Sequence, residues 1–298
     1  MFDLATIRGC VDIPRDLGCL LTTQRQAFVD FSGGLYDVPC PMQFAFPGDS
    51  SDCHIKGAHK RGSQELVLKI AGSSKLGNNG LILILDTLTW QVRAILNDEG
   101  FLTTLRTALA GILVAERLPW APTNIGIVGS GYLAKQLHDL ARLRFPEARI
   151  AVWSRTPGKA HAISSHTYNT PDALVAYCDT VFTTTASKSP LIETLPPNPR
   201  LALICLGSDD AEKSELSPML FAQADCVLVD SLSQAAKYGD IARALKKGVL
   251  PPSAPIELGA ALTLGINKNA RRIIADFSGI GAQDAAMAAF VVPRLSMT

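Results

Sequence analysis

The chain has 298 residues, which is long enough for two domains. Hydrophobic residues make up 47% of it and charged residues 18%, the composition of an ordinary folded protein with a large core. The 28 basic and 27 acidic residues leave a net charge of +1 and form no long run of one sign, which argues against a nucleic-acid arm or a membrane-surface patch.

Other features of the whole chain argue against a membrane protein, a secreted protein and a metal-binding protein. No apolar stretch approaches the roughly 20 residues that a membrane-spanning helix needs, and "MFDLATIRGC" lacks the pattern of a signal peptide. The seven cysteines are odd in number and include no Cys-x-x-Cys pair, a pattern typical of reduced thiols in a cytoplasmic protein. The five histidines show no ligand spacing, so no metal site is expected.

The first part of the chain predicts a mixed, largely antiparallel sheet. Segments 65–72 and 81–96 read as strands, with a glycine-rich turn, "GSSKLGNNG", between them. A helix is expected over 103–118, and "PWAPTN" then breaks it. We therefore place a domain boundary after residue 121.

From residue 122 onward, short apolar strands alternate with helices, which predicts a parallel sheet covered on both faces. The expected strands are 125–129, 150–154, 180–185, 201–207, 226–231 and 271–278. Helical patterns include 132–145 and 233–248. The prediction is an α/β protein with a Rossmann-type doubly wound parallel sheet over 122–281. A second, mixed α+β domain comprises 1–121 and 282–298, because the helix at 282–295 is expected to return to it.

A glycine turn, "GSGYLA", follows the first of these parallel strands and opens a helix, as a dinucleotide-binding fingerprint requires. Gly129 permits the tight turn, and Gly131 allows backbone to approach a pyrophosphate. Ala134 lets the helix pack closely on the strand, and the helix N-terminus supplies amide donors. A plain turn between strand and helix is the alternative.

The residues after the next strand bear on which dinucleotide binds. An NAD site has an acidic residue there, but this chain has Ser154 and Arg155, with Thr156 and Lys159 close by. A guanidinium can bind a 2′-phosphate bidentately, so NADP(H) is favoured and NAD(H) remains possible. Alternatively, Arg155 is a solvated residue at a helix start.

Two charged residues, Asp230 and Lys69, lie in predicted apolar strands, and each has two possible explanations. Asp230 ends a predicted parallel strand, where it either faces the nicotinamide and exchanges protons or caps the following helix. Lys69 lies within the apolar strand "LVLKIAG". It is either buried, at a cost of several kcal/mol unless paired, or on the wet face of an edge strand.

Arg106 falls in the first turn of the predicted helix, where the helix dipole disfavours a cation. An anion held by both the guanidinium and the helix N-terminus would account for it. The alternative is a surface ion pair.

These segments together make the chain resemble the ornithine cyclodeaminase/mu-crystallin family of NAD(P)-dependent enzymes. The resemblance extends from about Gln26 to Val292. It is carried by "HIKGAHK", "LVLKIAG", "GNNGLILILD", "DEGFLTTLRTALAG", "IGIVGSGYLAKQ", "VWSRTPGKA", "LGSDDAEKSEL", "VLVDS" and "FSGIGAQDAAMA".

The resemblance implies a substrate-binding and dimerisation domain around an inserted Rossmann domain, and hence a homodimer. Lys69 matches the active-site lysine, Arg106 the arginine that binds the substrate carboxylate, and Asp230 the aspartate that works as acid or base or orients the amine. The cofactor contacts it implies are Gly129, Ser130, Gly131, Tyr132, Leu133, Ser154, Arg155, Thr156, Lys159, Thr184, Thr185, Ala186, Ser231 and Gly279.

Two departures from the family pattern bear on the substrate. Cys40 and Met42 stand where members acting on ornithine have a second carboxylate-binding arginine. Lys56 stands at or near the place of the glutamate that holds the distal amine. A cation there would repel ornithine's side chain and could bind a carboxylate instead.

We therefore expect an enzyme that reduces a small 2-imino acid, a cyclic ketimine or a substrate with a second carboxylate, or that runs the reverse oxidation. The alternatives are a cyclodeaminase of ornithine or lysine with bound NAD+, and an NADPH-dependent ligand-binding protein of the mu-crystallin type. In each reading the partners are a small molecule and a second copy of the chain, without nucleic acid or membrane.

Overall fold

The computed structural model describes residues 1–46, 52–75, 77–210 and 212–295, which fall into two compact units. Unit 1 comprises Met1–Arg106 and Ile280–Thr298, and unit 2 comprises Thr107–Gly279. The division lies within helix α3 (Phe101–Arg117), ahead of the boundary expected after residue 121. Helix α3 therefore contributes residues to both units.

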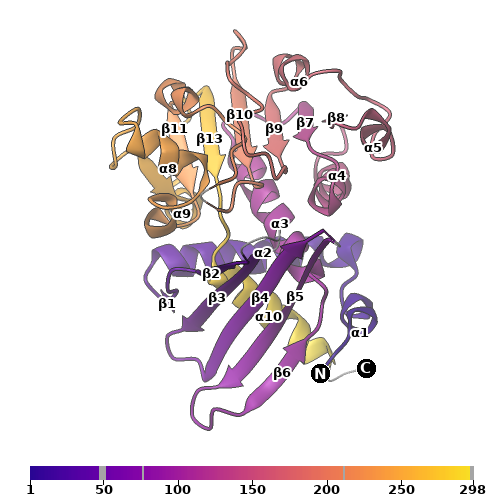
Figure 1. Cartoon of the computed structure of the whole chain (residues 1–298), viewed down its shortest axis with the longest axis vertical. Coiled ribbons are helices and arrows are strands. Elements are labelled where there is room, and N and C mark those ends of the chain that lie inside the picture. The colour runs from indigo at the N-terminus through magenta and orange to yellow at the C-terminus, as the bar shows by residue number, and fades with distance from the viewer. Residues whose placement is uncertain (47–51, 76, 211, 296–298) are drawn as a thin grey trace. The chain divides into compact units, whose positions relative to one another are not determined.

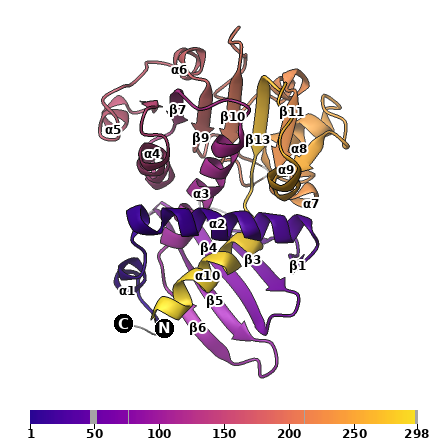
Figure 2. The same cartoon turned by 180° about the vertical axis from the view of Figure 1, so that it is seen from behind.

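Unit 1 is built on an antiparallel sheet with the order β1-β3-β4-β5-β6, in which β2 also pairs with β3. Helix α10 lies across β3 and β4 on one face, and α2 packs against α10 (Figures 1 and 2). Besides the start of α3, the elements are α1 (Leu4–Gly9), α2 (Ile13–Ser32), β1 (Tyr36–Asp37), β2 (Met42–Ala45), β3 (Asp52–Lys60), β4 (Glu65–Ser74), β5 (Gly77–Asp86), β6 (Val92–Leu96) and α10 (Gly281–Leu295).

The central residues of β4 and β5 alternate between a buried face and a partly exposed face. Val67, Ile82 and Ile84 are at most 4% exposed and point to the helix side. The opposite face also carries large apolar side chains, which remain partly accessible. This second apolar face, which we call the outer face, consists of Ile55, Leu66, Leu68, Ile70, Leu81, Leu83, Leu85, Val92 and Ile95.

Two features of unit 1 differ from expectation. Helices α1 and α2 were not predicted, although Asp12 caps α2 through the Arg15 amide and Pro14 stands in its first turn. The glycine-rich segment "GSSKLGNNG" belongs mostly to strands β4 and β5, and Lys75 after β4 lies in a turn. The C-terminal helix α10 belongs to unit 1, together with the N-terminal residues.

Unit 2 contains a parallel sheet with the order β12-β11-β13-β10-β9-β7-β8. The predicted Rossmann-type arrangement is thus confirmed. Besides the rest of α3, its elements are β7 (Asn124–Val128), α4 (Tyr132–Arg144), β8 (Arg149–Trp153), α5 (Pro157–His161), α6 (Pro171–Tyr177), β9 (Thr180–Thr183), β10 (Leu201–Cys205), the 3-10 helix η1 (Pro218–Gln223), β11 (Cys226–Val229), α7 (Leu232–Ala235), α8 (Gly239–Lys246), β12 (Pro255–Glu257), α9 (Leu258–Leu264) and β13 (Arg272–Asp276).

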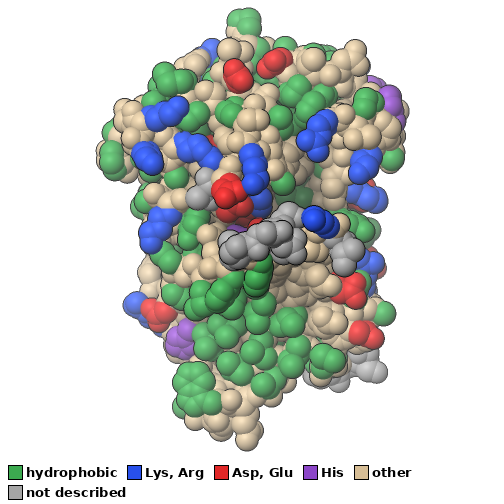
Figure 3. Space-filling view, in the orientation of Figure 1, with side chains coloured by type: hydrophobic (Ala, Val, Ile, Leu, Met, Phe, Trp, Pro, Cys, Tyr) green, Lys and Arg blue, Asp and Glu red, His purple; other side chains and the backbone are tan. Residues whose placement is uncertain are grey.

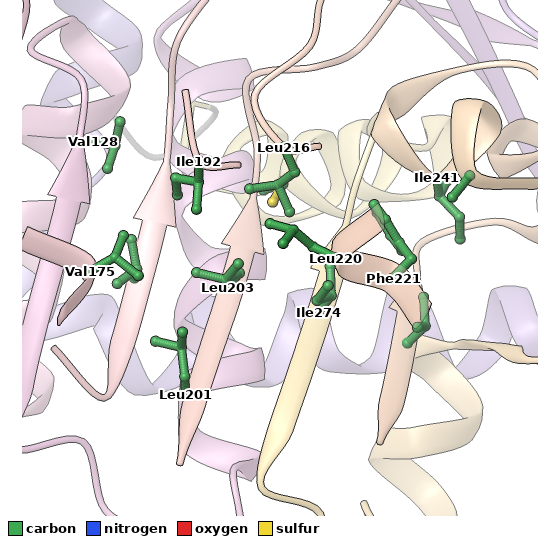
Figure 4. Close-up of a cluster of buried hydrophobic side chains, with 14 of the residues drawn as sticks. Val128, Val175, Ile192, Leu201, Leu203, Leu216, Leu220, Phe221, Ile241 and Ile274 are labelled. Atoms are coloured by element: carbon green, nitrogen blue, oxygen red, sulfur yellow. The ribbon is translucent and has the colours of Figure 1, made fainter. Parts of the chain in front are cut away.

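The order of the strands places a switch point at β7. The chain passes from β7 to β8 on one side, and β9 then lies on the other side of β7. Ligands of open parallel sheets bind beyond the carboxyl ends of the strands at such a point. The central strands are buried along their whole length because both faces of the sheet are covered, as the buried cluster of Leu203, Phe221 and Ile274 illustrates (Figure 4).

The predicted helix over 233–248 is in fact two helices, α7 and α8. Gly239 interrupts it with a φ of +81°, a left-handed conformation that an α-helix cannot contain. No helix in the described part of the chain is long and apolar enough to cross a membrane.

Candidate functional site

The glycine turn lies at the switch point, between β7 and α4. Gly129 has a φ of +134°, and a side chain on it would overlap the Thr184 hydroxyl. Gly131 precedes α4 with extended backbone and no side-chain cap, and a Cβ on it would meet nothing within 4 Å. Open space before uncapped first-turn amides is what a pyrophosphate requires. Ala134 is fully buried, as close helix packing demands.

The neighbouring contacts hold this turn to the end of β8. The Gly129 amide donates to the Trp153 carbonyl at 2.8 Å. The hydroxyls of Ser130 and Ser154 are hydrogen-bonded at 2.7 Å, and the Thr156 amide donates to Ser154 Oγ at 3.3 Å. The structure thus brings together four predicted cofactor residues, Gly129, Ser130, Ser154 and Thr156.

Three of the remaining predicted contacts of this part are solvent-exposed. Tyr132 is 86% exposed. Arg155 and Lys159 are exposed, and neither side chain has a hydrogen bond or ion pair with any residue that the structure describes. Their charges are therefore available to an anion, although a solvated Arg155 ahead of α5 is equally compatible with this geometry. Leu133 is half-buried in the first turn of α4.

The loop after β9, which contains Thr184, Thr185 and Ala186, is fixed by a carboxylate that sequence reasoning missed. Glu215 is fully buried, and its Oε1 accepts from the Thr185 amide at 2.5 Å and the Thr185 hydroxyl at 2.8 Å. Its Oε2 accepts from the Thr183 hydroxyl at 2.7 Å and the Gly207 amide at 3.0 Å. The ends of β9 and β10 are joined through this one side chain.

Glu215 belongs to a series of buried acidic groups. Asp240 accepts from the amides of Glu215 and Leu216 at 2.9 and 3.0 Å, and Asp276 accepts from the Ile241 amide at 2.7 Å. Burial raises the pKa of Glu215 to about 7, and burial together with its acidic neighbours raises the pKa of Asp276 well above its ordinary value. The segment "LGSDDAEKSEL" reads as a hydrophilic loop, so only the tertiary structure reveals Glu215 within it as buried.

Asp230 is 1% exposed and accepts a hydrogen bond from the Gly279 amide. The alternative role as helix cap is excluded, because Ser231 is the N-cap of α7 and its hydroxyl accepts from the Gln234 amide at 3.3 Å. Gly279 has a φ of +82°. The three predicted residues Asp230, Ser231 and Gly279 therefore lie at one end of β11 and β13.

Lys56 and Lys69 form a cross-strand pair in unit 1. They are register partners on β3 and β4, and each is only 4% exposed on the helix-covered face. Because β4 lies between β3 and β5, the wet-edge alternative for Lys69 is wrong. Side chains of like charge at directly opposite positions of neighbouring strands are unfavourable, and burial increases the cost of each charge.

Arg106 was expected in the first turn of its helix, which is incorrect. Helix α3 begins at Phe101, so Arg106 lies in the second turn, 4% exposed. Its Nε donates to Asp284 Oδ1 at 3.2 Å and its Nη1 to Gln283 Oε1 at 3.3 Å. The ion pair is therefore buried, rather than at the surface.

Asp98 accepts a hydrogen bond from a backbone amide at the start of α3, the place where an anion bound beside Arg106 was expected. Its Oδ2 accepts from the Leu102 amide at 2.6 Å, and burial raises the pKa of Asp98 to about 6, with the charge of Asp284 adding to the rise. The second oxygens of Asp98 and Asp284 are buried without a hydrogen-bond partner in the described part of unit 1. Sequence reasoning singled out neither residue.

Residues 79–298, most of the chain, match the model of the ornithine cyclodeaminase/mu-crystallin family. The chain belongs to this family. In the described residues no group of three or more acidic, histidine or cysteine side chains is arranged to hold a metal ion.

Individual relatives agree with the family assignment. An uncharacterized cyclodeaminase of Sinorhizobium fredii is 28% identical over 95% of this chain and 92% of its own. The iminosuccinate reductase of Paracoccus denitrificans is 26% identical over 73% of this chain and 71% of its own.

Solved structures share the fold. The structure of that iminosuccinate reductase in complex with NAD+ superposes with a TM-score of 0.84 at 22% identity, covering 99% of this chain and 95% of the other. An archaeal alanine dehydrogenase dimer with bound NAD gives 0.87 at 20% identity, covering 99% and 95%. The predicted family and fold are confirmed, and the expected oxidoreductase class matches the relatives' activities.

Proposed function

We propose that this family member is an NAD(P)H-dependent oxidoreductase that reduces a small 2-imino acid or cyclic ketimine to the amino acid, or catalyses the reverse oxidation. The observation that carries the proposal is the buried Lys56–Lys69 pair in unit 1. A carboxylate bound at these lysines would offset their mutual repulsion. This favours an anionic substrate over ornithine or lysine, whose side chain carries a positive charge.

Arg106 is proposed to bind the α-carboxylate with Lys56 and Lys69. The Asp284 and Gln283 contacts occupy its Nε and Nη1, which fixes the guanidinium plane in advance of binding. Such preorganisation supports catalysis because the substrate is oriented without the enzyme reorganising.

The bound dinucleotide supplies the hydride. Lys69 or Asp230 is proposed to supply the proton that keeps the substrate nitrogen cationic, which makes the imine carbon a better hydride acceptor. Both side chains are buried, so water competes little for these proton-transfer positions.

The preference between the two dinucleotides rests on Arg155 and Lys159. We propose NADP(H), because both cations are exposed after β8 and no carboxylate occupies the position that would bind a ribose hydroxyl. Replacing Arg155 by alanine should weaken NADPH binding about tenfold or more and leave NADH binding within about twofold. Fluorescence titration of both nucleotides measures this, and equal losses for the two would contradict the 2′-phosphate assignment.

A homodimer is proposed through the outer face of unit 1. Hydrophobic side chains gather over this sheet (Figure 3). At its rim Met42 is 57% and Val92 54% exposed. An apolar sheet face of this extent is typical of a protein-protein interface, and a second copy presents a complementary apolar face.

The test of the function follows the reduced-nicotinamide absorbance with purified protein, NADPH or NADH, and a panel of preformed cyclic imines, 2-oxo acids with amines, and 2-oxo diacids with amines. Oxidation that depends on an imino acid is the expected result. Ammonia release from ornithine without net absorbance change would instead establish a cyclodeaminase, the activity named for the Sinorhizobium relative. Dinucleotide binding without either reaction would favour a binding protein.

A further inference from the structure

The strongest feature outside the proposed chemistry is the carboxylate of Glu215. It receives four hydrogen bonds, two from Thr185 and one each from Thr183 and Gly207. These donors come from two neighbouring strand ends, because Thr183 ends β9 and Gly207 follows β10. Glu215 therefore links the ends of two strands. This link lies at the carboxyl edge of the parallel sheet, where ligands bind.

The geometry around the loop leaves little room for adjustment. A side chain on Gly129 would overlap Thr184, and one on Gly207 would overlap the backbone of Thr185. The Thr184 amide also donates to the Val128 carbonyl at 2.9 Å, and the Leu206 amide to the Thr183 carbonyl at 2.9 Å. Thr184 and Thr185 thus lie between the glycine turn and the β10 loop.

Glu215 is itself held in place. The Asp240 carboxylate accepts from its amide, and the Glu215 carbonyl accepts from the amides of Leu191 and Ile192 at 2.8 and 3.1 Å. A fully buried carboxylate is costly, and its burial is sustained by four donors and a fixed backbone. Removing one of its oxygens as an acceptor therefore releases the loop and leaves a buried amide without a partner.

We infer that Glu215 is a positioning residue for the dinucleotide: it sets the 184–186 loop against the glycine turn so that the loop is preformed before the cofactor binds. This rests on the proposed function, in which that loop contacts the dinucleotide. Glu215 itself touches neither cofactor nor substrate, because its side chain is enclosed by protein.

Glu215→Gln tests the inference, since the amide group matches the carboxylate in shape but replaces one acceptor by a donor. We expect its dissociation constant for NADPH, or for NADH if the wild type prefers it, to rise about fivefold to thirtyfold. In the dinucleotide-free protein, hydrogen exchange at the Thr185 and Gly207 amides should accelerate by at least about tenfold.

Asp179→Asn provides the matched control. Asp179 is also buried and accepts from Thr123, Asn124 and Thr180, but it ties the amino ends of β7 and β9, away from the ligand-binding edge. Both variants should lower the unfolding temperature. Only Glu215→Gln should change the dinucleotide affinity and the exchange at Thr185.

The outcomes separate the two proposals. If the wild type binds neither dinucleotide, the proposed function fails, and the exchange measurement alone decides whether Glu215 orders the loop. An affinity within twofold of wild type together with unchanged exchange in folded Glu215→Gln overturns the inference, as does an equal affinity loss in Asp179→Asn.

Should Glu215→Gln not fold, Thr183→Val removes one donor with little change of shape. It should raise the dissociation constant about twofold to threefold and speed exchange at Thr185, and no change in either overturns the inference.

Discussion

At the level of single residues, this protein buries several charged side chains, and their surroundings differ. Arg106 has Asp284, Glu215 has four donors, and Lys56 stands opposite Lys69. Buried charges cost stability unless they are compensated, so their retention favours a role in binding or positioning.

Arg106→Lys keeps the charge but loses the planar fork that contacts both Asp284 and Gln283. We expect the Michaelis constant for the imino acid to rise and turnover to fall, because a lysine cannot bind the carboxylate bidentately. Arg106→Ala should in addition destabilise the protein by about 3–5 kcal/mol, since it leaves the Asp284 carboxylate buried without its counter-ion. Steady-state kinetics and urea unfolding separate these effects, and wild-type kinetics in the lysine variant would remove the carboxylate-binding role.

Asp98 makes stability depend on pH. Burial raises its pKa from 3.8 to about 6, so its contribution to stability is fully present below about pH 4 and is lost as pH rises through about 6. Asp98→Asn keeps an oxygen for the Leu102 amide but does not titrate. The variant should therefore gain up to about 2–3 kcal/mol relative to wild type between pH 4 and 7. Urea unfolding of both proteins across this range measures the difference, and parallel profiles would contradict the assignment.

At the scale of elements, glycines with positive φ decide where helices and turns stand. Periodicity over 233–248 predicts one helix, but Gly239 divides it and brings its own Cα close to the Asp276 carboxylate. The break lets the Ile241 amide reach that carboxylate. The helical periodicity of the sequence therefore predicts one helix, whereas the contact with Asp276 requires the break at Gly239.

Gly239→Ala would increase helix propensity, yet we expect it to destabilise the protein by more than about 2 kcal/mol. A Cβ at this position would lie 2.5 Å from an Asp276 oxygen, and the φ of +81° is unfavourable for alanine. Gly248→Ala is the matched control, because it has a φ of +67° but open space around the added carbon, and it should cost only about 1 kcal/mol. Similar losses in chemical unfolding would show that backbone conformation, rather than the close approach, is responsible.

At the scale of the whole molecule, the proposed assembly depends on a sheet with two apolar faces. One face is covered by α10, and the outer face is apolar across β3, β4 and β5. Burying that face against a second copy would remove apolar area from water, the main favourable contribution to association.

Leu83→Lys places a charge at the centre of the outer face, where Leu83 pairs with Leu68 and Ile95. We expect the dimer to dissociate into monomers, because a lysine buried between two apolar sheets would be desolvated without a partner. Light scattering coupled to size exclusion measures the mass. Leu143→Lys, at an exposed position on α4 in unit 2, is the control and should leave the mass unchanged. A Leu83→Lys protein of unaltered mass would exclude this face as the interface.

The parallel sheet of unit 2, the position of the glycine turn and the family could all be predicted from the sequence. Short apolar strands and a Gly-x-Gly turn are local patterns that depend little on distant residues. The sequence also singled out Lys69 and Arg106, because charges within apolar segments are visible in one dimension. Their surroundings required the folded structure, which shows that Lys56 is the register partner of Lys69 and that Asp284 forms an ion pair with Arg106. The burial of Glu215 likewise became visible only in the fold. These facts come from contacts between residues far apart in sequence, and hydropathy assigns acidic residues such as Glu215 and Asp240 to solvent because it does not record which donors the fold brings to them.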